Sequence, residues 1–63
     1  MKTMFDVQQL LKRFGTIIYT GNRTADLELI QEEVNELYKQ KLIDVNDYKM
    51  ALLIVRATLN KRQ

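Results

Sequence analysis

The sequence contains no cysteine, histidine, serine, tryptophan or proline. Without cysteine no disulfide can staple the fold, and the sequence does not encode the redox state of its compartment. The missing side chains also include the commonest nucleophiles, the commonest general base and the soft metal ligands. Carboxylates are the acid–base candidates that remain. We therefore predict a protein that is not an enzyme and that uses no cofactor and no metal.

Residues that break helices are equally scarce, because Gly15 and Gly21 are the only glycines. A chain of 63 residues has room for one domain, and at this size about 60% of the unfolded surface is buried on folding. Apolar residues recur at spacings of three and four in three segments. We predict an all-α fold, a compact three-helix bundle over residues 1–63, with helices at about 4–14, 25–41 and 45–60.

Several short motifs mark the ends of these helices. Thr3 followed by Asp6 forms a plausible capping box for the first helix, and Gly15 is placed to end it in a left-handed cap. Thr24 is the expected cap of the second helix and Asp44 that of the third. The start and stop signals therefore support the same three segments as the apolar spacing.

The segment between the first two helices is β-branched and aromatic over Thr16–Thr20, which locally favours a strand. A lone strand has nothing to pair with, and the chain offers no second candidate. We therefore expect an extended connector, with Ile17 or Ile18 anchored in the core.

The third helix contains six consecutive apolar residues, Met50–Val55. A surface helix has an apolar stripe about 100° wide, whereas six residues cover the whole circumference. We predict that the third helix is the most buried. Alternatively, its surplus apolar face docks a protein partner or a second copy, giving a homo-oligomer.

Neither a membrane span nor a secretory signal is expected. No window approaches the roughly 18 apolar residues of a transmembrane helix. Residues 1–14 mix polar and charged side chains among the apolar ones, unlike a signal peptide. The expectation is a soluble, cytoplasmic protein.

Charge is segregated along the chain. Residues 1–24 hold four basic residues and one acidic residue. Residues 25–44 hold two basic and six acidic residues, and residues 45–63 hold four basic residues and one acidic residue. The row Glu28, Glu32 and Glu36 could be imagined as a metal site, but helical carboxylate sites also use histidine. A solvated acidic face is the better interpretation. The two basic segments either attract the acidic one or form a face for polyanions.

The best candidate site is the stretch Tyr19–Thr24. A glycine turn that leads into a helix start suits a phosphate, Arg23 adds a bidentate donor, and Tyr19 offers a stacking surface. The competing interpretation is a simple turn and helix cap with Tyr19 packed on the bundle. A helix-turn-helix is disfavoured, because its reading helix presents polar side chains and the third helix here is apolar.

The whole chain resembles the YqgQ-like family of small bacterial proteins, a domain of unknown function. The resemblance covers about residues 1–60 and is carried by the segments Phe5–Leu11, Tyr19–Arg23, Asp26–Leu29, Glu36–Tyr38 and Leu42–Asp44. It implies a three-helix bundle and a role in binding single-stranded nucleic acid. It implies no catalytic residue, metal or cofactor.

The leading hypothesis is non-catalytic binding of single-stranded RNA or DNA, with cations on phosphates and a tyrosine on a base. The predicted interface consists of Lys12, Arg13, Tyr19, Asn22, Arg23, Lys49 and Arg56. The rival hypothesis is a protein-interaction module or homo-oligomer that uses the third helix.

Overall fold

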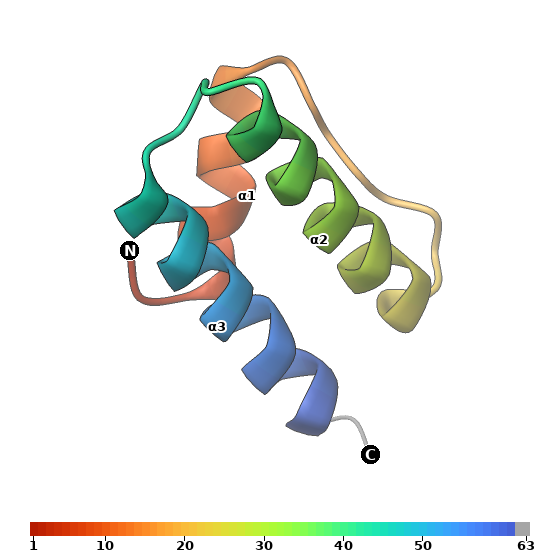
Figure 1. The fold of residues 1–63 in the computed structure, drawn as a ribbon. Coiled ribbons are helices and arrows are strands. Elements are labelled where there is room, and N and C mark those ends of the chain that lie inside the picture. Colours follow the sequence, from red (N-terminus) through yellow and green to blue (C-terminus); the bar gives the residue numbers. More distant parts are fainter. Residues whose placement is uncertain (62–63) are drawn as a thin grey trace.

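Three helices form the fold of the computed structural model, which describes residues 1–61 (Figure 1). Helix α1 spans Met4–Arg13, α2 spans Arg23–Lys39 and α3 spans Val45–Lys61. The all-α three-helix prediction is confirmed, and no strand occurs within the described part of the chain. The expected bounds differ from the observed ones by at most two residues.

Helices α1 and α2 run in the same direction, and α3 runs back along α2 (Figure 1). The chain must therefore return from the end of α1 to the far end of α2 through residues 14–22. A helix of 17 residues is about 25 Å long, and nine extended residues span at most about 30 Å. The connector is accordingly extended, which explains why strand-favouring residues occur here without a sheet.

The helix starts are capped by side chains. Asp6 N–H donates to Thr3 Oγ1 at 3.4 Å while Thr3 N–H donates to Asp6 Oδ2 at 3.1 Å, which completes the predicted capping box. Asp47 N–H donates to Asp44 Oδ1 at 2.8 Å, as predicted for α3. The predicted cap of α2 is wrong. Asn22, two residues before Thr24, accepts from Ala25 N–H at 3.0 Å and starts the helix earlier.

Two helix ends use the same left-handed turn. After α1, Gly15 has φ +81°, and the N–H groups of Gly15 and Thr16 donate to Lys12 O and Leu11 O. After α2, Lys41 has φ +61°, and Lys41 and Leu42 make the equivalent pair of bonds to α2. Both are Schellman motifs. A lysine in this conformation places its Cβ close to the backbone carbonyl, which costs stability.

Helix α2 supplies the largest part of the core, so the prediction that the third helix is the most buried is wrong. Helix α3 contributes only two buried side chains, Ala51 and Val55. The buried apolar residues are Val7, Leu10 and Leu11 of α1, Leu27, Ile30, Val34 and Leu37 of α2, Ile43 of the α2–α3 joint, and Ala51 and Val55.

The reason lies in the position of α2 between two neighbours. Helix α3 packs along one side of α2, and the connector lies against another, where Ile18 packs on the core and Thr20 bonds to Asp26. Helix α3 packs against both α1 and α2, but these contacts do not cover its whole circumference, and Leu53 stays 64% exposed and Met50 37% exposed. The apolar run in α3 is therefore longer than the surface that the bundle can cover.

We predict that replacing Lys41 with glycine stabilises the protein. Glycine adopts a positive φ without the steric cost, so Lys41→Gly should raise the free energy of unfolding by about 1 kcal/mol. Urea denaturation followed by circular dichroism measures the change. Lys41→Ala is the control, because it removes the same charge but keeps a Cβ. Equal stability of the two variants would contradict the assignment of the gain to backbone strain.

The α1 capping box should make stability depend on pH. The N–H groups of Lys2 and Thr3 donate to the Asp6 carboxylate and hold its pKa below the ordinary value of 3.8. The folded state thus binds this proton less readily than the unfolded state. The stabilisation is present above the unfolded pKa and is lost as the pH falls through the folded pKa.

Urea titrations of the wild type and Asp6→Asn across the acid range test this. We expect the wild type to lose stability more steeply below about pH 4, so that the difference between the two proteins shrinks there. Parallel curves throughout the acid range would show that the carboxylate charge contributes nothing.

Candidate nucleic-acid interface

An open hollow of about 310 Å³ lies between α1 and the connector. Lys12 and Tyr19, which were predicted as binding residues from separate segments, both line this hollow. The amide side chains of Gln8 and Gln9 line it as well. Its apolar lining consists of Leu11, Ile17, Ile18 and Ile30. We call this surface the connector hollow.

The side chains around the connector hollow suit a planar, partly polar ligand joined to an anion. Tyr19 is 85% exposed, so its ring is available for stacking. The amides of Gln8 and Gln9 each carry both donors and an acceptor, which is what the edge of a nucleobase requires. The Lys12 ammonium is exposed and can meet a phosphate as a point charge.

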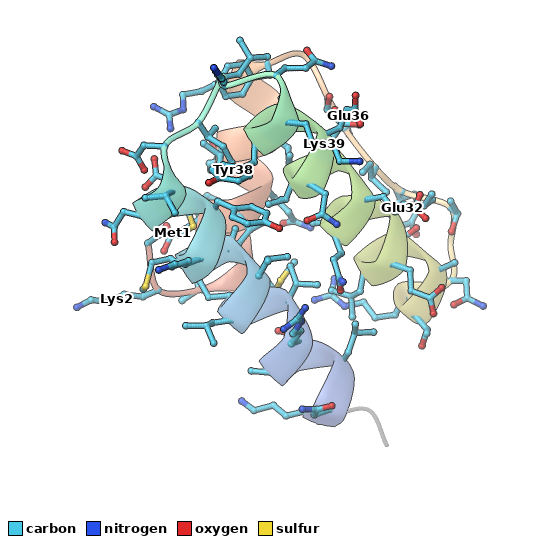
Figure 2. The ribbon with its side chains drawn as sticks, in the orientation of Figure 1. Met1, Lys2, Glu32, Glu36, Tyr38 and Lys39 are labelled. Atoms are coloured by element: carbon cyan, nitrogen blue, oxygen red, sulfur yellow. The ribbon has the colours of Figure 1, made fainter. Side chains whose placement is uncertain are left out.

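The exposed side of α1 extends this surface toward the start of the helix. Phe5 is 65% exposed and precedes Gln8 and Gln9 by three and four residues, which places it on the same helical face. Phe5 therefore offers a second exposed aromatic ring, besides Tyr19, on the face of α1 that carries the glutamines. By contrast, Tyr38 of α2 (Figure 2) and Tyr48 of α3 stack on each other with their ring centroids 4.1 Å apart, so one face of each ring is already occupied.

A buried carboxylate holds the connector in place. Asp26 is only 6% exposed, and its Oδ1 accepts from Thr20 N–H at 2.7 Å and from Thr20 Oγ1 at 2.6 Å. This pair, which we call the Thr20–Asp26 clamp, fixes the connector one residue after Tyr19. Our sequence analysis missed it. The sequence did contain a signal for this clamp. Asp26 lies one helical turn before Ile30, on the face of α2 that is buried in the core.

The remaining predicted binding residues do not join this hollow. Arg13 lines a different hollow, whose lining also includes the acidic residues Asp6 and Asp47. Asn22 uses its side-chain oxygen to cap α2. The structure therefore assigns Asn22 a role in starting the helix, and the sequence pattern of a turn before a helix is explained without a ligand.

Three further predicted cations gather around α3. Arg23 lines a groove with Leu53 of α3. Lys49 and Arg56 are exposed and lie four residues before and three residues after Leu53, on the same helical face. The predicted interface is thus dispersed. Lys12 and Tyr19 share the connector hollow and three cations lie around α3, whereas Arg13 and Asn22 belong to neither surface.

The other side of the connector is acidic. Glu32, Glu33 and Glu36 of α2 line a neighbouring hollow with Thr16 and Ile18, and Figure 2 shows Glu32 and Glu36 on the outer side of α2. No group of three or more carboxylates, histidines or cysteines in residues 1–61 is arranged to hold a metal ion. The negative potential of these three glutamates therefore lies on the α2 side of the connector, and Lys12 lies on the α1 side.

None of the helices in the described part of the chain combines the length and the apolar character that crossing a membrane requires.

We predict that the Thr20–Asp26 clamp is a main anchor of the connector. Asp26→Ala leaves the Thr20 N–H without its acceptor and should lower the free energy of unfolding by about 1–3 kcal/mol. Asp26→Asn retains a carbonyl oxygen and should cost less, and Thr20→Val removes only the hydroxyl donor. Urea denaturation ranks the three variants. If Asp26→Ala unfolds at the same urea concentration as the wild type, the anchoring role is contradicted.

Comparison with known proteins identifies the family. The model of the YqgQ-like family matches residues 1–61. The uncharacterized protein YqgQ of Bacillus subtilis (strain 168) is 39% identical over 61 residues, which cover 97% of this chain and 86% of that protein. The match spans α1, the connector, α2 and α3 together. The chain therefore belongs to the YqgQ-like family.

Proposed function

We propose that this protein binds single-stranded nucleic acid, RNA or DNA, in the connector hollow, without catalysis. The observation that carries the proposal is that Lys12 and Tyr19 line one open hollow with the amides of Gln8 and Gln9. A cation, an aromatic ring and hydrogen-bonding amides are the three elements that grip an unpaired nucleotide.

In the proposed complex, an unpaired base stacks on Tyr19 and directs its edge at Gln8 or Gln9. The adjoining phosphate meets the ammonium of Lys12, and a second base can stack on Phe5 farther along α1. The Thr20–Asp26 clamp limits the motion of the connector, so less ordering is required when the base arrives.

A duplex does not fit this surface as well as a single strand. The paired bases of a duplex are stacked on one another, so their faces are unavailable to Tyr19. The acidic row of α2, reached across the connector, would also lie close to the second strand and repel it. These two features favour a flexible strand that contacts α1 and Tyr19 of the connector and stays clear of the acidic side of α2.

The test is fluorescence anisotropy of a short labelled single-stranded oligonucleotide at low salt, in RNA and DNA forms. Tyr19→Ala should weaken binding by about 1–3 kcal/mol, which is roughly 5- to 150-fold. Tyr19→Phe is the matched control and should bind nearly as well, because the ring remains. Lys12→Ala should reduce the slope of log K against log salt by about 0.7, the value for one phosphate contact on a single strand.

Lys49→Ala serves as the control for loss of a cation, because Lys49 lies on α3 away from the connector hollow. No change in anisotropy with the wild-type protein would contradict the proposal. So would equal effects of Lys49→Ala and Lys12→Ala, because binding would then depend on net charge and not on this hollow.

A further inference from the structure

A second surface of the molecule is an apolar groove of about 500 Å³ beside the last two turns of α3. Leu53, Ile54 and Ala57 provide its apolar floor, and the starts of α1 and α2 line its sides. We call it the α3 groove. None of the residues that line it also lines the connector hollow.

The charged side chains that line the α3 groove all carry the same sign. They are Lys2, Arg23 and Lys61, and no carboxylate is among the lining residues. Figure 2 shows Lys2 extending away from the bundle, so its ammonium is available to a partner. Lys49 and Arg56 continue the cationic surface along the exposed face of α3, on either side of Leu53.

The apolar part of the α3 groove is also exposed. Leu53 is 64% exposed, although a leucine gains about 1.5–3 kcal/mol from full burial. Ala57 is exposed beside it, and Thr58 is turned back on its own helix, where its hydroxyl donates to Ile54 O at 2.8 Å. The floor therefore presents aliphatic surface with its one hydroxyl already satisfied.

We propose that the α3 groove binds an acidic amphipathic helix of a partner protein. In this mode leucine-like anchors on one face of the partner cover Leu53 and Ala57, and carboxylates on its flanks meet Lys2, Arg23 and Lys61. The stretch from Leu53 to Lys61 covers about 12 Å of helix, which matches about two turns of a partner helix.

Other occupants fit the α3 groove less well. Its lining contains no aromatic ring, so a nucleic acid would gain phosphate contacts but no stacking. A membrane surface calls for several large apolar side chains on a helix face, whereas Leu53 is the single large, mostly exposed one in the groove. A second copy of this chain offers a row of glutamates on α2, but Leu29, the exposed leucine beside them, is only 41% exposed, and Tyr38 is stacked on Tyr48.

The test uses a labelled synthetic helical peptide in which leucines form one face and glutamates the other, and a matched peptide with lysine in place of glutamate. The wild-type protein should bind the glutamate peptide in anisotropy titrations and should not bind the lysine peptide. The double variant Arg23→Glu/Lys61→Glu should weaken binding about tenfold or more, because each reversal removes an attraction and adds a repulsion.

Two matched controls separate the α3 groove from general effects. Lys39→Glu/Lys41→Glu makes the same change in net charge at the end of α2, outside the groove, and should leave binding unchanged. Leu53→Gln should weaken binding about tenfold, as for an interface anchor, whereas Ile17→Gln, at an even more exposed apolar position in the connector hollow, should not.

The proposal is overturned if the wild-type protein binds neither peptide, or if both double variants lose affinity equally. If anionic lipid vesicles or an oligonucleotide bind at Arg23 and Lys61 more strongly than the glutamate peptide does, the α3 groove is assigned to those ligands instead. A doubled mass in light scattering that Leu53→Gln abolishes would assign it to a second copy. Loss of oligonucleotide binding to the connector hollow alone would leave this proposal standing.

Discussion

The parallel direction of α1 and α2 is the constraint on which the rest of the structure depends. It obliges residues 14–22 to cross the length of the bundle in an extended form, where their backbone cannot pair within a helix or sheet. Ile18 and the Thr20–Asp26 clamp hold this segment against the bundle. The same crossing buries α2 from a second side and leaves a hollow along α1.

Helix caps and turns that depend on neighbouring residues in the sequence could be predicted from the sequence. The capping box at Thr3 and Asp6, the cap at Asp44 and the left-handed turn at Gly15 all depend on neighbours a few residues away. The start of α2 was misplaced because Asn22 and Thr24 are both competent caps two residues apart. The left-handed Lys41 was missed because no glycine marks that position.

Features decided by the packing of distant segments could not be predicted. The apolar run Met50–Val55 was interpreted as a buried helix, although it says nothing about how many neighbours α3 will have. Likewise, the positions of the cations along the chain do not reveal where they lie in the fold. Lys12 lines the connector hollow, whereas Arg23 lies beside α3 and Arg56 is part of it. Asp26 was counted as part of an acidic segment, whereas its buried side chain serves Thr20.

The connector hollow and the α3 groove differ in the side chains that accompany their cations, and this difference is why we propose a different ligand for each. Coulomb attraction between exposed charges is weak and largely screened by salt beyond about 10 Å, so cations alone attract any anion without choosing among them. At the connector hollow the neighbours of Lys12 are an aromatic ring and two amides, which favour an unpaired base. In the α3 groove the neighbours of Arg23 and Lys61 are aliphatic, which favours a leucine-like anchor. Under these two proposals, a chain of 63 residues has two separate binding surfaces, because the long connector supplies one and the incompletely covered α3 supplies the other.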